Sequence, residues 1–329
     1  MAEGLNGLAT CYMMCSNDEI RERITRGHIS VYEASYYDNE KNRLVANPER
    51  MVAEYKKFNP EDERNSDHVR PPFTLIQTVD YLKRLYLCRR DTQDIDMCCI
   101  FLHNRMQAVV DELLYQKAAA FDCVLVLQAM IPFYVEIAAL LKCRGIDVFT
   151  ESEHCFFLKR LFKIWLQHVR GVKEEDKGLI DERILMYIVF SNPYAPRSVQ
   201  KIVDDYRDLF RPETLRFVLD IVLAIRTNNY VKYFKLYSLL EPISKCCLFD
   251  VTALVRQVSM RQIMAAYRCP QQYLNVMKFA KWLGFNDVGT CAKFLQYYAK
   301  TNIETVVPML TLREPFIKTR GFWILSATL

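Results

Sequence analysis

Basic side chains recur at helical spacing in the stretch Asp287 to Lys300 near the end of the chain. Lys293, Gln296, Tyr297 and Lys300 fall at i, i+3, i+4 and i+7, so a helix would place them on one face. Lysines on such a face contact phosphates through charge and carry no base specificity. We predict a nucleic-acid-binding surface here, with a plain solvated face as the alternative. The full predicted set is Lys278, Lys281, Lys293, Gln296, Tyr297, Lys300, Lys318 and Arg320.

The distribution of charge supports this prediction. From Val251 to Leu329 ten Lys and Arg residues stand against three acidic residues, a surplus of seven positive charges. Because the whole chain has a net charge of +5, the preceding part carries a net −2. A surplus gathered at one end of a chain indicates a polyanionic partner.

The other reactive residue types match no catalytic motif. The sequence holds no phosphate-binding glycine loop, no G-x-S-x-G elbow, no H-E-x-x-H and no pair of C-x-x-C knuckles. Cys11, Cys15 and His28 fall short of the four ligands that a zinc site needs. Cys155 lies beside His154, and Cys143 is nearby. On spacing alone these residues could form a cysteine nucleophile with its base, which we keep as an alternative. We therefore predict no enzyme activity, no metal and no cofactor.

Composition indicates a large helical protein in a reducing compartment. With 329 residues, 51% of them hydrophobic, and only 9 glycines, the chain can bury a sizeable core without long flexible linkers. The 12 cysteines are scattered and no secretory signal precedes them. The most apolar window, Ala118 to Leu141, is interrupted by polar residues, so we expect a buried helix there and no membrane partner.

Apolar periodicity and helix-start prolines predict a series of helices separated by short breaks. Three parts are expected: an arm of short helical pieces over residues 1–60, a helical array over 61–245 and a compact unit over 246–329. The arm pieces are ATCYMMCSNDEIRERI, ISVYEA and PERMVAEYKKF. The array begins with RPPFTLIQTVDYLKRLYL, where Leu75, Val79, Leu82 and Tyr86 should face inward. Further helices are expected at Ile100–Lys117, Phe121–Lys142, Ser152–Val169, Asp181–Phe190, Ser198–Phe210 and Pro212–Arg226.

An aromatic stripe separates the array from the basic unit. In TNNYVKYFKLYSLL the residues Tyr230, Tyr233, Phe234 and Tyr237 share one helix face, which we expect to pack and to position the helices beyond it. Those helices are expected at Phe249–Tyr267, from Pro270 to Gly284 with Leu274, Met277 and Leu283 inward, and after Asp287 as a cap, with Val288, Cys291, Ala292, Leu295 and Tyr298 inward. The β-rich runs ETVVPMLTL and PFIKTRGFWIL should then pair as a hairpin. Three helices and a terminal hairpin form a winged-helix pattern.

Five sequence blocks, in order, resemble the central domain of the SAC-three/GANP family of mRNA-export scaffolds. They are TCYMMCSNDEIRER, RMVAEYKK, HVRPPFTLIQTVDYL, NRMQAVVDELLYQ and TNNYVKYFKL. The resemblance implies a mainly α fold, a TPR-like, PCI-type right-handed superhelix followed by a C-terminal winged helix with a small β-hairpin. The chain departs from the family at Asn104, Gln107 and Val110, which replace charged residues, and at Glu112, which replaces an aspartate.

The resemblance also implies a non-catalytic scaffold or adaptor in a nuclear mRNA export or processing complex at the nuclear pore. Its implied partners are a PCI-domain protein, a small acidic disordered peptide and RNA bound jointly with the PCI partner. Thr305–Leu312 and Phe316–Ile324 are then candidates for the PCI contact. The predicted partner-binding residues are Val306, Val307, Met309, Phe316 and Trp323. Similarity to short SAC domain-containing proteins leaves an alternative, a protein-binding role at the centrosome or mitotic spindle, with the cytoplasm as a second location.

Overall fold

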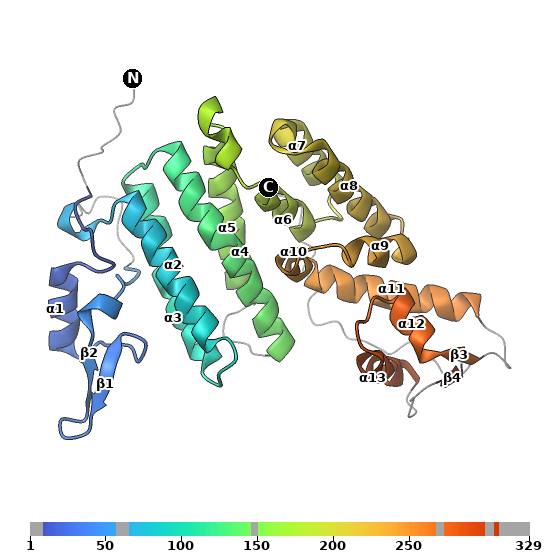
Figure 1. Cartoon of the computed structure of the whole chain (residues 1–329), viewed down its shortest axis with the longest axis horizontal. Helices are drawn as coiled ribbons and strands as arrows, with labels where there is room; N and C mark the ends of the chain where they lie inside the picture. Colours follow the sequence, from blue (N-terminus) through green and yellow to red (C-terminus); the bar gives the residue numbers. More distant parts are fainter. Residues whose placement is uncertain (1–8, 57–65, 146–150, 268–272, 300–305, 309–329) are drawn as a thin grey trace. The chain divides into compact units, whose positions relative to one another are not determined.

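Helices make up most of the chain in the computed structural model, which describes residues 9–56, 66–145, 151–267, 273–299 and 306–308 (Figure 1). Two short antiparallel strand pairs accompany them. The expected mainly α class is therefore confirmed. The chain divides into two compact units, Met1–Asp181 and Glu182–Leu329.

The first unit contains a run of long helices preceded by a small α/β arm. Its helices are α1 (Asn17–Arg26), α2 (Pro72–Arg89), α3 (Ile95–Tyr115), α4 (Ala120–Arg144) and α5 (Glu151–Val169), with 3-10 turns at Pro48–Arg50, Ser66–His68 and Glu174–Leu179. The α2 helix begins at its second proline, where a missing N–H costs nothing. Its predicted inward residues Leu75, Val79, Leu82 and Tyr86 are all fully buried, as expected.

The α4 helix is apolar on all sides and lies inside the first unit. By length and composition it is the one helix of the described residues able to cross a membrane, with a window of mean hydropathy 2.1. However, 61% of that window is buried within the protein, and α2, α3 and α5 all contact α4. An apolar helix enclosed in this way is a core helix, as its interrupted apolar sequence predicts.

The arm differs from the expected series of short helices. Only the first piece contains an α-helix, α1, which begins at Asn17, eight residues after the expected start at Ala9. ISVYEA and the residues after it lead into β1 (Ala34–Asp38), which pairs antiparallel with β2 (Arg43–Ala46), and PERMVAEYKKF is helical only in the 3-10 turn Pro48–Arg50 among its described residues. The β-branched and aromatic residues on each side of a polar turn favour this hairpin, whose turn places Asn42 at a φ of 48°.

The second unit continues the helical series with shorter helices. They are α6 (Arg183–Ser191), α7 (Pro196–Tyr206), α8 (Pro212–Arg226), α9 (Tyr230–Tyr237), α10 (Pro242–Cys247), α11 (Phe249–Ala266), α12 (Val276–Trp282) and α13 (Val288–Ala299), with a 3-10 turn at Arg207–Leu209. The strands are β3 (Tyr273–Asn275) and β4 (Val306–Pro308). The α8 helix starts at Pro212, as the sequence predicts, whereas α7 starts at Pro196, two residues before the expected Ser198.

The aromatic stripe lies on α9 and packs inside the second unit. Tyr233 and Phe234 are buried, whereas Tyr230 and Tyr237 are half-buried. The Tyr233 hydroxyl lies 2.7 Å from the Thr252 hydroxyl on α11, and α9 also contacts α12. The stripe therefore joins the preceding helices to α11 and α12, which is the positioning role expected from the sequence.

The strands of the second unit correct the expected start of α12. Residues Tyr273–Asn275 form β3, so α12 begins only at Val276, and Met277 is 65% exposed where the periodicity predicted an inward position. The strand expected within Thr305–Leu312 is present as β4, which pairs with β3. Its expected partner, Phe316–Ile324, lies outside the described residues.

Candidate nucleic-acid interface

The predicted binding helix α13 starts at a well-formed N-cap. The Asp287 carboxylate accepts hydrogen bonds from the Thr290 backbone N–H at 2.6 Å and from the Thr290 hydroxyl at 2.9 Å. The Thr290 backbone bond comes first among the causes that lower the pKa of Asp287, so the cap is ionised at neutral pH. The sequence-predicted cap is confirmed, and it sets the residue at which α13 begins.

Burial on α13 follows the predicted pattern at three of the five expected inward positions, and the side chain of the fifth, Tyr298, lies outside the described part. Cys291 and Leu295 are fully buried and Ala292 nearly so, whereas Val288 is 41% exposed and does not belong to the inward face. On the opposite side Lys293 and Tyr297 are exposed, and Gln296 is half-buried. The basic, aromatic face of α13 therefore points to solvent.

The α12 helix contributes the next two predicted lysines. It is capped by Asn275, whose side chain accepts the Met277 N–H at 2.8 Å, and it contacts α13. Phe279 is fully buried, while Lys278 and Lys281, one helical turn apart, are exposed. Two adjoining helices thus each present exposed lysines.

Of the remaining predicted residues, the structure describes only two. Val306 and Val307 lie on β4, opposite Asn275 and Leu274 of β3. The other predicted residues of both sets, Lys300, Met309, Phe316, Lys318, Arg320 and Trp323, lie outside the described residues.

Arg256 on α11 holds the turn between α12 and α13, a role that sequence reasoning missed. Its Nε donates to the Leu283 carbonyl at 3.0 Å and its Nη2 to the Gly284 carbonyl at 3.1 Å. Its guanidinium also lies 4.1 Å from the centre of the Phe285 ring. Burial lowers the pKa of Arg256, and these carbonyl and ring contacts stabilise the charged form in return. The orientation of the lysine-bearing helices therefore depends on one half-buried arginine.

The cysteine and histidine candidates have the surroundings of structural residues. Cys11 and Cys15 are buried, and burial raises the pKa of both thiols. Burial also lowers the pKa of His154 to about 3, so this imidazole is a very weak base beside Cys155. Within the described ranges no three His, Cys, Asp or Glu side chains gather closely enough to hold a metal ion.

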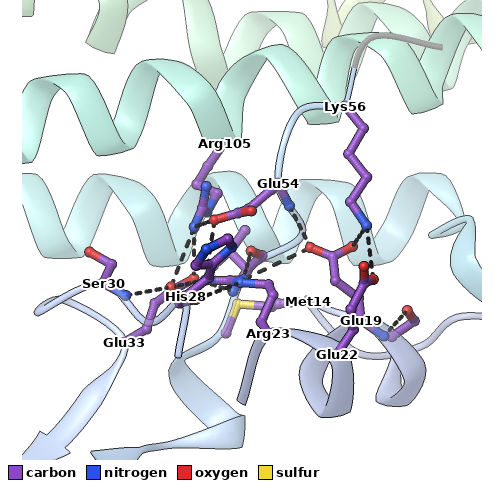
Figure 2. Close-up of polar contacts among 12 residues, drawn as sticks. Met14, Glu19, Glu22, Arg23, His28, Ser30, Glu33, Glu54, Lys56 and Arg105 are labelled. Carbon is purple, nitrogen blue, oxygen red and sulfur yellow. Dashed lines mark hydrogen bonds and ion pairs between the residues drawn. The ribbon is translucent and has the colours of Figure 1, made fainter. Parts of the chain in front are cut away.

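A buried ion network ties the arm of the first unit to α3 (Figure 2). Glu33 is fully buried between Arg23 of α1 and Arg105 of α3, and it forms ion pairs with both. Arg105 also lies 2.9 Å from Glu54, and Glu33 accepts the Val52 backbone N–H at 3.0 Å. Charges at this depth persist only when paired and hydrogen-bonded, as they are here.

A second buried pair lies next to this network. Arg70 and Glu112 form two parallel hydrogen bonds, and Arg70 also donates to the Met14 carbonyl at 3.0 Å. Gln116 donates to the Arg70 carbonyl at 3.0 Å. Arg23, Arg70, Arg105 and Glu112 all belong to the sequence blocks that resemble a known family, so three blocks distant in sequence meet through their charges.

The same blocks, except for the first four residues of the first one, fall within a match between this chain and a known family. The model of the SAC3/GANP family matches residues 14–304. The chain belongs to the SAC3/GANP family. SAC3/GANP domains are generally non-catalytic scaffolds, and the family indicates the setting of nuclear mRNA-export complexes. In this SAC3/GANP chain the charged residues Arg23, Arg70, Arg105 and Glu112 of these blocks connect the arm to α3.

The departures from the SAC3/GANP pattern on α3 leave this fastening intact. Asn104, in place of an aspartate, accepts the Tyr55 N–H at 3.2 Å. Val110, in place of an arginine, is fully buried in the core, and Gln107 is half-buried. Arg105 and Glu112 keep their internal ion pairs. The substitutions therefore leave the buried ion pairs of Arg105 and Glu112 in place.

Proposed function

We propose that this SAC3/GANP chain is a non-catalytic scaffold that pairs with a PCI-domain protein in a nuclear mRNA-export or processing complex and forms part of an RNA-binding surface. A small acidic disordered peptide is the third subunit of the proposed complex. The observation that carries the proposal is the exposure of Lys278, Lys281 and Lys293 on two contacting helices within the family match. Lysines so arranged bind phosphates without base specificity.

The order of elements in residues 249–308 supports a winged helix as the framework of this surface. In chain order the elements are α11, β3, α12, α13 and β4. The first strand lies between the first two helices, and the second strand, which is antiparallel to it, follows the third helix. A right-handed superhelix of the preceding helices, over residues 61–245, is part of the same proposal. The partner-binding side of the winged helix would include Val306 and Val307.

Co-purification followed by RNA binding tests the proposal. A tagged full-length chain should recover a PCI-domain protein, and the pair should shift a short RNA in a native gel. Lys278→Glu, Lys281→Glu and Lys293→Glu together should abolish the shift while leaving the pairing intact. The matched control reverses three exposed cations on and after α7 of the same unit, Arg197, Lys201 and Arg207.

Recovery of no PCI-domain protein, or equal RNA binding by the α12–α13 variant and the control variant, would contradict the proposal. Imaging a tagged chain tests the alternative role at the centrosome or mitotic spindle. A steady centrosomal or spindle signal without nuclear enrichment would favour the protein-binding role instead.

A further inference from the structure

A second exposed basic surface lies on α5, in the first unit. From the second turn of the helix to just beyond its end, the outward positions are Phe156, Lys159, Lys163, Gln167 and Arg170, each exposed, at spacings of three or four residues. The opposite side, including Phe157, Leu161 and Trp165, is buried against the unit. The outward residues form one straight track of about 21 Å, given the helical rise. We call this set the α5 track.

The sign of the charge on the α5 track is unusual for a solvated helix face. Soluble surfaces usually mix acidic and basic residues, yet the acidic residue of this face, Glu153, precedes Phe156 and leaves the track itself without a carboxylate. Asp111 of α3 pairs with Arg160, which stands off the track, at 2.9 Å. Lys159 and Lys163 also lie before the last turn of α5, so complementing the helix dipole does not account for them.

The adjoining turn extends the α5 track. A Cβ placed on Gly171 would lie 3.1 Å from the Ala120 Cβ, so the end of α5 packs on the start of α4. The turn before α4 carries exposed Lys117, and exposed Lys173 follows Gly171. Lys117 thus adds a cation near the end of the helix, whereas Lys173 pairs with Glu175 at 3.7 Å and is followed by the exposed Glu174.

We propose that the α5 track binds the phosphate backbone of single-stranded RNA, as a second contact in addition to the α12–α13 surface. This inference rests on RNA being a ligand of the protein, as in the proposed function. A line of cations with an exposed aromatic ring at one end fits a single strand, because the cations follow the backbone and the ring stacks on a base. Phe156 is 72% exposed and offers that ring.

The test compares RNA binding by full-length variants, with the partner where pairing is needed, across a series of KCl concentrations. The probe is a short fluorescent oligouridine, followed by anisotropy. Lys159→Gln, Lys163→Gln and Arg170→Gln together should weaken binding roughly tenfold or more at physiological salt and make the slope of log K against log salt shallower by about 2. The control neutralises three other exposed cations of the unit, Arg21, Arg26 and Arg84.

A separate variant, Phe156→Ala, tests stacking. It should weaken binding by about tenfold without changing the salt slope, because it removes no charge. Unchanged affinity would overturn the stacking contact. All the variants alter exposed side chains, and circular dichroism should give the wild-type melting curve.

The outcomes separate this inference from the proposed function. If the α5 variant binds like the control while the α12–α13 variant loses RNA, the α5 track is overturned and the proposed function stands. If the α5 variant alone loses RNA, the track is supported and the α12–α13 surface fails. If the α5 variant loses affinity for polyglutamate and not for RNA, the face binds acidic protein, which overturns the inference.

Discussion

Arg70 and Glu112 form a buried ion pair with two hydrogen bonds that ties the chain before α2 to α3. The Arg70 Nε lies 2.9 Å from Glu112 Oε2, and the Arg70 Nη2 lies 2.5 Å from Glu112 Oε1. Burial disfavours the charged guanidinium, but the charge and hydrogen bonds of Glu112 outweigh it and raise the pKa of Arg70. The two residues are 42 positions apart and belong to two different sequence blocks of the SAC3/GANP family.

Replacing Glu112 with alanine should destabilise the first unit by about 3–5 kcal/mol, because it leaves a buried guanidinium without its counter-ion. Urea unfolding followed by the fluorescence of Trp165, which is fully buried in this unit, measures the effect. The control is Arg160→Ala, which breaks the more exposed pair with Asp111 and should cost about 1 kcal/mol or less. Equal costs for the two variants would contradict the role of the buried pair.

Glu33→Gln should loosen the arm while leaving the helical part of the first unit folded. The change removes the buried negative charge that Arg23 and Arg105 share, and it weakens the acceptor of the Val52 N–H. Hydrogen exchange at Val52 should accelerate by roughly a hundredfold if the local opening free energy falls by about 3 kcal/mol. Glu40→Gln, at an exposed position of the hairpin turn, is the control. Wild-type exchange at Val52 in the Glu33 variant would refute the anchoring role.

Acid should destabilise the first unit through His154. This imidazole is buried and stacked on Tyr134, with ring centres 4.3 Å apart, and burial first, then the charges of His103 and Lys142, lower the pKa of His154 to about 3. The folded-state pKa lies below the unfolded value of about 6.5. The unfolded chain therefore binds the proton first, and stability falls as pH decreases from about 6.5 toward 3.

The expected loss from His154 is about 2 kcal/mol between pH 7 and pH 5. His154→Phe keeps a ring against Tyr134 and should remove most of this loss, as measured by urea unfolding at the two pH values. His168, which lies half-buried on the same helix, is the control position. The same pH dependence in wild type and His154→Phe would exclude this histidine as its source.

Gly284→Ala should destabilise the α12–α13 turn by about 2–4 kcal/mol. Gly284 has a φ of 62°, and a Cβ there would overlap the Phe234 ring, so backbone strain and overpacking add. Gly145→Ala separates the two causes, because Gly145 has a similar φ of 64° but open space around its Cβ position. Its cost should be about 1 kcal/mol by thermal unfolding. A smaller cost at Gly284 than at Gly145 would contradict the close packing on α9.

Local signals in the sequence predicted the long helices well. Pro72 and Pro212 mark the first residues of α2 and α8, and Asp287 marks the cap of α13. Helical spacing also predicted the exposure of Lys278 and Lys293, because on each helix the apolar residues occupy one face and leave the opposite face to solvent.

Features that depend on distant contacts were not predictable in this way. The β3 strand forms because Leu274 pairs with Val307, more than thirty positions later, whereas local propensity suggested a helix. The arm residues Val52 and Glu54 donate their N–H groups to buried glutamates in place of helical carbonyls. Nothing in the local sequence identifies Arg256 as the residue that binds two carbonyls of the α12–α13 turn.

The most direct test of the central claim is the salt dependence of RNA binding by the chain together with its PCI-domain partner. Lys278→Gln, Lys281→Gln and Lys293→Gln remove three charges from the α12–α13 surface. If these lysines contact phosphates, the triple variant should bind more weakly, with a slope of log K against log salt shallower by about 2 than that of the wild type. The wild-type slope and affinity in the triple variant would contradict an RNA-binding role for this surface.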